Sequence, residues 1–353
     1  MIAPKTAFYK SALNSLYYTG AYRTLEPHWR GIGVIFTLHH VRPAGGQQLF
    51  APNRILEITP AFLEQTIKQV RKLGYEIVSL DEVHRRLTEE DSRTPFVSFT
   101  LDDGYADNYA HAFPIFKRYE APFAVYVCTG LLEGCADLWW RRLEQIVLRE
   151  NRVEATLNGA RRVFEAHTPR QKYHAFETVY WALRGMPLQL QLETRQELGK
   201  RYPETGTDAG PASAPLSWDM LLEMRNSGLM TVGAHTVNHH ALSKLTTDAA
   251  RREVEQSCDV LASRTGETPR HFAYPYGDVL SASNREFAVS QELGFATAVT
   301  TRKGVLFPDH AQHLHALPRV SLNGDYQQSR YVRLFLSGAP FALSSGFRRR
   351  LAG

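Results

Sequence analysis

Cysteine is scarce in this chain of 353 residues. Only Cys128, Cys135 and Cys258 occur, and no two of them form a Cys-x-x-Cys pair. This pattern excludes a disulfide framework and a zinc site built on thiolates. A sparse and odd cysteine count is typical of proteins from a reducing compartment.

Long apolar runs are also missing. No stretch approaches the ~20 consecutive apolar residues that a membrane-spanning helix needs. The first segment, MIAPKTAFYKSALNSLYYTG, has no uninterrupted apolar core and no small-residue cleavage site, so it does not predict a signal peptide. We therefore expect a cytoplasmic protein, or one that is peripheral at the inner membrane surface.

Charge of one sign is not concentrated anywhere. There are 41 Lys and Arg residues against 36 Asp and Glu, which gives a formal net charge of +5. Because the basic residues are scattered, the charge does not predict a nucleic-acid partner. The oligomeric state cannot be predicted from the sequence.

Both ends of the chain are apolar and basic. Residues 1–30 contain an amphipathic helix over 11–18, which predicts a helical arm packed on the main domain; a helix lying on a membrane surface is the alternative. Residues 326–353 form a tail that either packs on the main domain or contacts anionic lipid. Peripheral membrane contact therefore stays open.

A globular core is feasible, because 43% of the residues are hydrophobic and 22% are charged. Apolar runs alternate with amphipathic helical patterns over short connections, which is the signature of a parallel α/β sheet or barrel. Residues 131–215 interrupt this alternation and are polar and helical in pattern, so we expect a helical insertion there. The expected strands are 33–38, 75–79, 96–101, 123–129, 229–234, 270–277, 295–300 and 317–320.

Two adjacent tryptophans lie inside the insertion. Trp139 and Trp140 could line a cleft for a sugar ring. The alternative is that they belong to the core of the insertion, as paired tryptophans on a helix more often do.

Polar side chains capable of chemistry follow four of the expected strands. They are Asp102 with Asp103, His39 with His40, His235 with His239, and the turn at 274–277. Because the carboxyl ends of parallel strands meet at one face, a closed or nearly closed sheet would bring all four together.

The spacing of His235 and His239 lets two imidazoles share one metal ion if the segment is helical or tightly turned. One added carboxylate would complete a site with open positions for water and substrate. Such a ligand set suits Zn²⁺, and also Fe²⁺, Co²⁺, Ni²⁺ or Mn²⁺. A bound ion of this kind lowers the pKa of water and polarises a carbonyl.

Three segments in this order resemble the successive motifs of the polysaccharide deacetylases of carbohydrate esterase family four, the NodB-homology domain. They are TLDDG at 100–104, HTVNH at 235–239 and YPYG at 274–277. The resemblance implies an α/β fold, a distorted (β/α)7 barrel over residues 31–325 with the helical insertion at 131–215.

The resemblance also implies roles for individual residues. Asp103, His235 and His239 would bind a divalent metal ion, which we expect to be Zn²⁺, with Co²⁺, Ni²⁺ or Mn²⁺ as alternatives. Asp102 would be the general base that deprotonates the attacking water. The backbone N–H of Tyr276 would help to hold the oxyanion.

The sequence departs from the family pattern at two places. The Arg that usually follows the Phe of the third motif is replaced by Ala273, so Arg319 on the last strand is the expected substitute that orients the base. The late motif that supplies the acid histidine is not clear. One branch, which resembles the poly-N-acetylglucosamine deacetylases, carries that histidine on the first strand, so we expect His39 to be the acid, with His315 as the alternative.

The predicted function is metal-dependent hydrolysis of N-acetyl groups on an amino-sugar polysaccharide or its lipid-linked precursor, which makes an N-acetylated glycan the expected partner. One alternative keeps the site and changes the substrate, as a deformylase or a hydrolase of small cyclic amides. A second alternative is an inactive sugar-binding protein, which the missing Arg after Phe272 allows.

Overall fold

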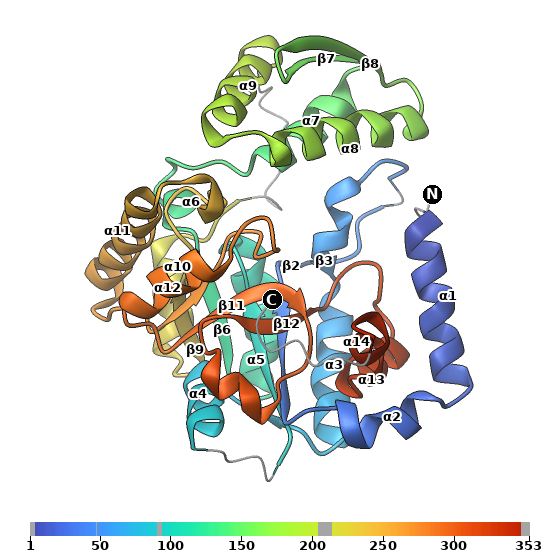
Figure 1. Ribbon diagram of the computed structural model, residues 1–353, viewed down its shortest axis with the longest axis vertical. Coiled ribbons are helices and arrows are strands. Elements are labelled where there is room, and N and C mark those ends of the chain that lie inside the picture. Colours follow the sequence, from blue (N-terminus) through green and yellow to red (C-terminus); the bar gives the residue numbers. More distant parts are fainter. Residues whose placement is uncertain (1–3, 47, 90–93, 204–213, 347–353) are drawn as a thin grey trace. The chain divides into compact units, whose positions relative to one another are not determined.

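The computed structural model describes residues 4–46, 48–89, 94–203 and 214–346 (Figure 1). The chain divides into two compact units. The barrel unit comprises Met1–Pro43, Leu56–Ala136 and Pro215–Gly353, and the insert unit comprises Ala44–Ile55 and Asp137–Ala214. The insert unit thus holds most of the expected insertion and also takes Ala44–Ile55, which the sequence analysis assigned to the barrel.

The barrel unit is built on one parallel sheet. Its first strand, β1, pairs with β12 on one side and with β5 on the other, which closes seven strands into a ring and leaves β4 outside, beside β5. This confirms the predicted (β/α)7 barrel. In sheet order the strands are β1 (Gly33–Leu38), β12 (Leu317–Ser321), β11 (Thr297–Lys303), β10 (His271–Ala273), β9 (Met230–Ala234), β6 (Phe123–Val127), β5 (Phe96–Leu101) and β4 (Glu76–Ile77).

Strands β1 and β5 are buried along their whole length, as expected of parallel strands covered on both faces. They pair in register from Gly33 opposite Phe96 to Leu38 opposite Leu101. A Cβ atom at Gly33 would lie 2.4 Å from the Phe96 ring, so the close approach requires glycine here. The register brings the residues that follow both strands to the same level.

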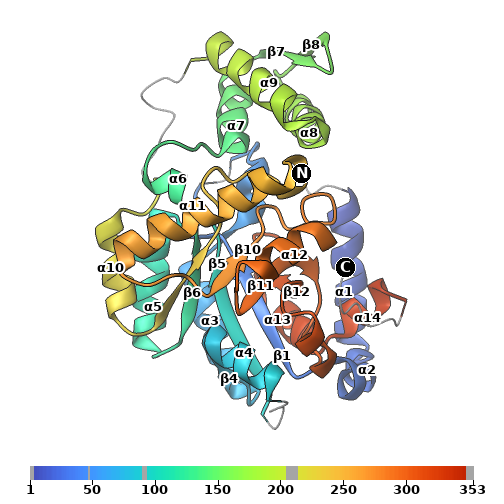
Figure 2. The same cartoon turned by 60° about the vertical axis from the view of Figure 1, so that its left-hand side comes forward.

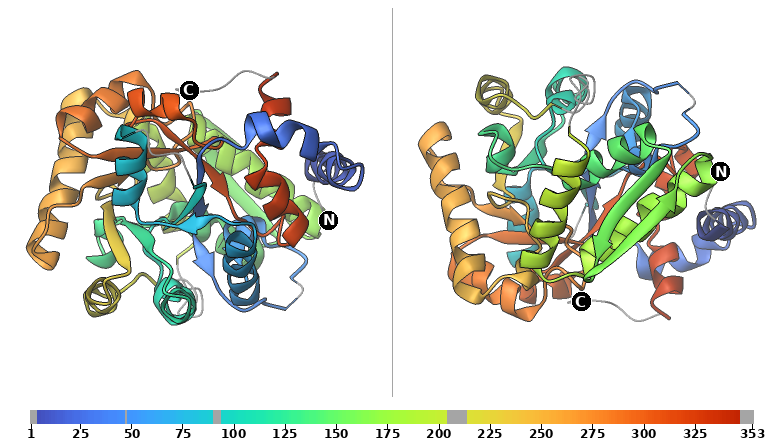
Figure 3. Two further views of the ribbon diagram at one scale, coloured as in Figure 1. Left: turned by 90° about the horizontal axis from the view of Figure 1, so that it is seen from below. Right: turned by 90° about the horizontal axis from the view of Figure 1, so that it is seen from above.

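Helices surround the strands (Figures 2 and 3). Several begin at side-chain caps that the sequence offers: Thr59, Ser79, Ser217 and Thr246 each accept a backbone N–H of the first turn. The helices of this layer are α3 (Pro60–Lys72), α4 (Leu80–Thr88), α5 (Phe113–Arg118), α6 (Thr129–Leu132), α10 (Trp218–Asn226), α11 (Thr247–Thr265) and α12 (Asn284–Glu292).

Shorter elements complete the connections. The strands β2 (His40–Val41) and β3 (Glu57–Ile58) form a separate parallel pair, and η2 (Asn108–Ala112) is a single π-helical turn before α5. Three 3-10 turns are η1 (Pro52–Leu56), η4 (Leu242–Lys244) and η5 (Pro308–Gln312).

The terminal helices lie side by side in the barrel unit (Figure 1). They are α1 (Pro4–Tyr18), α2 (Tyr22–Trp29), α13 (Ser329–Leu336) and α14 (Ala339–Ser344). Asn14 accepts hydrogen bonds from Arg330 (2.8 Å) and Tyr331 (3.2 Å), and Arg333 makes a two-armed ion pair with Glu26 at 2.7 and 2.6 Å. The expected arm and tail therefore pack on each other, and residues 347–353 of the tail lie outside the described residues.

Within the described ranges, no helix combines the length and the apolarity that a bilayer crossing requires.

The insert unit is not purely helical, which corrects the expected helical insertion. Besides α7 (Trp139–Arg149), α8 (Pro169–Gly185) and α9 (Leu188–Arg201), it contains an antiparallel hairpin of β7 (Arg152–Leu157) and β8 (Ala160–Glu165). The hairpin turns at Asn158 and Gly159, whose φ angles are both positive. Asn-Gly is a strong sequence signal for such a turn and could have predicted this hairpin.

Trp139 and Trp140 are both buried in the insert unit. Their rings meet edge to face at 5.8 Å, and Trp139 stacks on Tyr180 at 5.1 Å. The core interpretation therefore holds for both tryptophans, and the structure does not support a sugar-binding cleft formed by them.

Candidate metal centre and active site

The two adjacent carboxylates after β5 point to different partners. The Asp102 N–H donates to the Leu38 carbonyl at 2.9 Å, which continues the pairing with β1. At Asp103 the backbone turns into the left-handed region, with φ of 74°. This turn sends the Asp103 side chain toward two histidines, while Asp102 faces an arginine.

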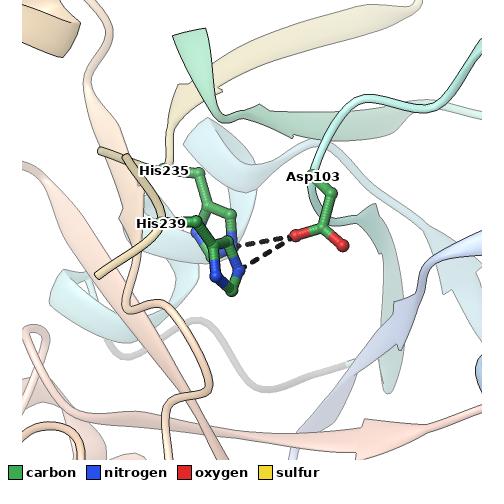
Figure 4. A group of neighbouring side chains, drawn as sticks. All are labelled: Asp103, His235 and His239. Carbon is green, nitrogen blue, oxygen red and sulfur yellow. Dashed lines mark ion pairs between the residues drawn. The ribbon is translucent and has the colours of Figure 1, made fainter. Parts of the chain in front are cut away.

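Asp103, His235 and His239 converge on one point (Figure 4). The Asp103 Oδ1 atom lies 3.3 Å from His235 Nε2 and 3.2 Å from His239 Nε2, and all three residues are buried. Their possible ligand atoms lie within 4.8 Å of one another. The structure thus brings together the three residues that the sequence analysis named as ligands.

The tautomer of His235 is fixed by a hydrogen bond. Its Nδ1–H donates to the Ala273 carbonyl at 2.7 Å, so the lone pair of Nε2 faces Asp103. Metal-binding histidines are commonly held in this way by a carbonyl behind the ring.

The loop between the two histidines is braced from α11. Glu253 accepts hydrogen bonds from the backbone N–H groups of Val237 (3.3 Å) and Asn238 (3.0 Å) and from the Asn238 side chain (2.6 Å). The His239 N–H donates to Thr236 Oγ1 at 3.1 Å. These contacts hold both imidazoles on the same side of the loop.

The donor set fits a divalent cation. Burial would raise the pKa of the Asp103 carboxyl, but the two imidazoles hold it well below its ordinary value, so the group is an anion. No hydrogen bond from the described residues reaches Asp103 Oδ1, although it is buried. An anionic oxygen without a hydrogen bond, facing two imidazole nitrogens, is suited to sharing one cation with them.

Asp102 is paired with Arg319. The guanidinium Nη1 and Nη2 atoms lie 2.7 and 2.6 Å from the two carboxylate oxygens, and both side chains are buried. Arg319 is itself fixed by Nε, which donates to the Thr300 carbonyl at 2.9 Å. Burial would raise the pKa of Asp102, but the charge and hydrogen bonds of Arg319 outweigh it, so the pKa lies below its ordinary value.

The expected substitute for the missing arginine thus reaches the expected carboxylate. Ala273 occupies the position after Phe272, on β10, and the guanidinium arrives from β12 instead. Arg270 lies elsewhere and pairs with Asp81 of α4.

His39 follows β1 and is half-buried. It is close enough to Asp102 and Asp103 for its charge to lower the pKa of both carboxyls. His315, the alternative acid, precedes β12, and its Nε2–H donates to the Phe295 carbonyl before β11, at 2.8 Å. His315 is therefore at the amino-terminal end of the strands, and the structure does not bring it to Asp102.

Tyr276 lies beside the histidines in a constrained turn. Its ring centroid is 4.8 Å from that of His239, and its φ is 61°. Thr301 holds the turn, because its Oγ1 donates to the Tyr276 carbonyl at 2.6 Å and its N–H donates to the Gly277 carbonyl at 3.0 Å.

The family model for polysaccharide deacetylase matches residues 89–298, more than half of the chain. This range contains the two aspartates, the two histidines and the Tyr276 turn. The chain belongs to the polysaccharide deacetylase family. The comparison with curated proteins found no match.

Solved structures share the fold of this deacetylase. The deacetylase PplD of Streptococcus pyogenes, in complex with acetate, is 20% identical with a TM-score of 0.57, over 86% of this chain and 97% of that chain. IcaB from Ammonifex degensii is 19% identical with a TM-score of 0.55, over 86% and 97%. A de-N-acetylase from Aggregatibacter actinomycetemcomitans is 15% identical with a TM-score of 0.54, over 86% and 99%.

Strained backbone is concentrated in the site of this deacetylase. Six non-glycine residues in the described part of the chain have positive φ, and four of them are Asp103, Thr236, His239 and Tyr276. Each such residue costs on the order of 1–3 kcal/mol and persists only where its surroundings enforce it. The hydrogen bonds that Glu253 accepts and that Thr301 donates are part of that enforcement.

Sequence reasoning missed three residues that support the site: Asp107, Asn108 and Glu253. Asp107 and Asn108 follow closely behind the Asp102–Asp103 pair in the sequence, but no motif marks them as supports. Glu253 is distant in sequence from the loop that it braces, and no local pattern connects the two.

Proposed function

We propose that this deacetylase hydrolyses N-acetyl groups on an amino-sugar polysaccharide or its lipid-linked precursor, in a reaction that depends on a divalent metal ion. The observation that carries the proposal is an arginine-paired carboxylate, Asp102, directly beside the ligand set of Asp103, His235 and His239. A protein that only binds sugar would have no need for a second, ionised carboxylate at a metal site.

Asp103, His235 and His239 would hold the ion. When bound there, a divalent cation supplies Lewis-acid polarisation of the acetyl carbonyl and favours ionisation of water. Zn²⁺ suits this donor set best, and Co²⁺, Ni²⁺ or Mn²⁺ are alternatives.

The residues of the chain would perform the proton transfers. Asp102 takes a proton from a water molecule while the oxygen of that water bonds to the acetyl carbonyl carbon. Arg319 keeps the Asp102 carboxylate ionised and oriented. The Tyr276 N–H would donate to the oxygen that becomes negative. His39 gives a proton to the nitrogen as the C–N bond breaks, which leaves a free amine and acetate. The similar structure of PplD holds acetate, one of these two products.

The alternatives differ in substrate or in turnover. A deformylase or cyclic-amide hydrolase would use the same six side chains on a smaller substrate. An inactive sugar-binding protein was allowed by Ala273, but the pairing of Arg319 with Asp102 supports an oriented base and argues against that alternative.

Acetate release from N-acetylated oligosaccharides tests the proposal. We expect release that a chelator abolishes and that added Zn²⁺, Co²⁺, Ni²⁺ or Mn²⁺ restores. Asp102→Asn should lower kcat by at least about 100-fold while it still binds the glycan and the metal. Release that is insensitive to verified metal removal would refute the metal role. Turnover of formamides or cyclic amides without acetate release would favour the first alternative.

We further propose peripheral contact with an anionic membrane, on the cytoplasmic side, through α1. This helix exposes Phe8, Tyr9 and Tyr18 at 71, 59 and 72%. Aromatic residues favour the membrane–water interface, and the net charge of +5 favours anionic lipid. Vesicles with phosphatidylglycerol should retain the wild type and release Phe8→Ser/Tyr18→Ser, whereas Trp181→Ser, an exposed aromatic of α8, should behave as wild type. Equal retention of all three would exclude α1 as the contact.

A further inference from the structure

We propose that Asp107 and Asn108 are positioning residues that fix the segment bearing His39. The inference rests on the proposed role of His39 as the proton donor. It concerns residues that contact neither the substrate nor the metal, and it explains how a histidine at the end of one strand is held beside carboxylates at the end of another.

The contacts fall on three successive residues. The Asn108 side-chain Nδ2–H donates to the His39 carbonyl at 2.8 Å. Asp107 Oδ2 lies 2.6 Å from His40 Nδ1, and Asp107 Oδ1 accepts the Val41 N–H at 3.3 Å. Two adjacent side chains therefore hold the chain from the His39 carbonyl to the Val41 N–H, directly after the His39 side chain.

Asp107 and Asn108, which we call the clamp, are buried and hydrogen-bonded to each other. Asn108 and Asp107 are 0% and 7% exposed, and the Asn108 Nδ2–H also donates to Asp107 Oδ1 at 3.1 Å. The His40 ring stacks on Tyr105 with 3.6 Å between centroids. A buried carboxylate is costly unless it is paired, and Asp107 is paired through both oxygens. Its partners all belong to the segment after β1 or to Asn108.

The local fold explains the placement. Asp107 and Asn108 stand at the start of the π-helical turn η2, directly after the turn that carries Asp102 and Asp103. Turns of this kind are frequent at functional sites. One short stretch of chain, residues 102–108, thus carries the proposed general base and a proposed metal ligand. It also carries the two side chains that bind the segment of the proposed proton donor.

The rate of proton donation depends on the position of the His39 side chain. A proton donor must come within about 2.6–3.2 Å of the departing nitrogen, and a displacement of about 1 Å can cost 10²-fold in rate. Asn108 is the side chain that holds the His39 carbonyl, so its loss should misplace the acid without removing any reacting group.

The test compares two substrates that differ in their need for an acid. An amide such as an N-acetylated chitooligosaccharide must have its nitrogen protonated, whereas the nitrophenolate of 4-nitrophenyl acetate leaves without a proton. His39→Ala is the benchmark and should lower kcat on the amide far more than on the ester. We expect Asn108→Ala to lower kcat on the amide about 10- to 100-fold with unchanged KM, and kcat on the ester by less than about 3-fold.

Two further variants complete the design. Asp107→Asn keeps the size of the side chain and removes its charge, and it should show the same substrate difference to a smaller extent. Tyr75→Phe is the matched control, because it removes a buried hydrogen bond to a backbone carbonyl, that of Leu336 at 3.1 Å, elsewhere in the barrel unit. It should affect both substrates equally or not at all.

The outcomes separate the two proposals. If His39→Ala loses both substrates equally, the role of His39 as proton donor is refuted. In the second case, His39→Ala lowers kcat on the amide far more than kcat on the ester. If Asn108→Ala and Asp107→Asn then lower kcat on both substrates equally, or lower neither, the clamp is refuted. Circular dichroism of each variant identifies a loss caused by unfolding, and an unfolded Asn108→Ala leaves the decision to Asp107→Asn.

Discussion

Arg319 shows how a closed barrel can supply a side chain from a different strand. Its guanidinium forms both arms of the ion pair with Asp102, although the family pattern places an arginine on the strand that here carries Ala273. Strands β12 and β10 are separated by β11 in the ring, and their side chains point into the same interior. The arginine that pairs with Asp102 therefore comes from a later strand than the family pattern predicts.

Replacing Arg319 should destabilise the fold as well as the site. Arg319→Met leaves the Asp102 carboxylate buried without a partner, so we expect a loss of about 3–5 kcal/mol in the free energy of unfolding, measured by urea titration. Arg319→Lys should lose less free energy of unfolding, because it keeps the positive charge. Some loss should remain, because lysine cannot form the two-armed ion pair. Arg333→Met is the control, since the Arg333–Glu26 pair has the same geometry but is partly exposed. An equal loss in the two methionine variants would contradict the argument.

Single residues were predictable where the chemistry is local. The two aspartates and two histidines stand next to strands that the sequence makes evident, and the barrel brings them together as expected. Asp107, Asn108 and Glu253 were not predictable as supports, because their partners are 15 to 69 positions away and depend on the register of β1 with β5 and of α11 with its loop.

At the scale of elements, α6 and the loop after β9 meet at Gly130. The Gly130 N–H donates to the Val237 carbonyl at 3.0 Å, between His235 and His239, the two proposed metal ligands. A Cβ atom at Gly130 would lie 2.4 Å from that carbonyl oxygen. The contact has no room for a side chain, so one of the two backbones would have to move.

Gly130→Ala should therefore weaken metal binding. We expect the Kd for Zn²⁺ to rise about 10-fold, in the range seen when outer supports of a ligand are removed. Competition with a chromogenic chelator measures this directly. Gly185→Ala is the control, because a Cβ atom there meets no atom within 4 Å. An unchanged Kd in Gly130→Ala would show that the loop adjusts without moving the histidines.

Helix and strand periodicity predicted most elements of the barrel unit, because capping residues and glycines in the sequence stand where its helices and strands begin and end. The hairpin of β7 and β8 was missed, because β8 reads ARRVFE and is mostly exposed, without an apolar face of its own. The assignment of Ala44–Ile55 to the insert unit depends on contacts with residues more than a hundred positions away, such as the Ala51 N–H that donates to the Tyr173 hydroxyl. Local patterns cannot show such contacts.

At the scale of the whole barrel, the two ends of the strands have different tasks. The carboxyl ends carry the proposed active site. At the amino ends, His271 of β10 lies 3.4 Å from Asp81 in the first turn of α4, and Arg270 pairs with the same carboxylate. The hydrogen bond from His271, opposed by burial, holds the pKa of Asp81 below its ordinary value.

This pairing predicts a pH-dependent contribution to stability. Because the pKa of Asp81 is lower in the folded chain, the stabilisation is fully present above the unfolded value of about 3.9 and is lost as the pH falls through the folded value. Asp81→Asn should lower the free energy of unfolding by about 0.5–1 kcal/mol at pH 6, a small loss because the carboxylate is partly exposed and screened. The gap, which is the difference in this free energy between the variant and the wild type, should narrow below about pH 4. Urea unfolding at several pH values measures the gap. Deacetylation should be unaffected, and a gap that widens toward low pH would reverse the assigned sign.

The double pairing of β1 also bears on how the chain is made. A ribosome releases residues 33–38 early, yet one neighbour of that strand, β12, lies at 317–321. Until then β1 and β11 present open edges, on which another chain could pair. Nascent chains are therefore expected to be most aggregation-prone late in synthesis, when nearly the whole barrel has emerged and only its last strand is missing.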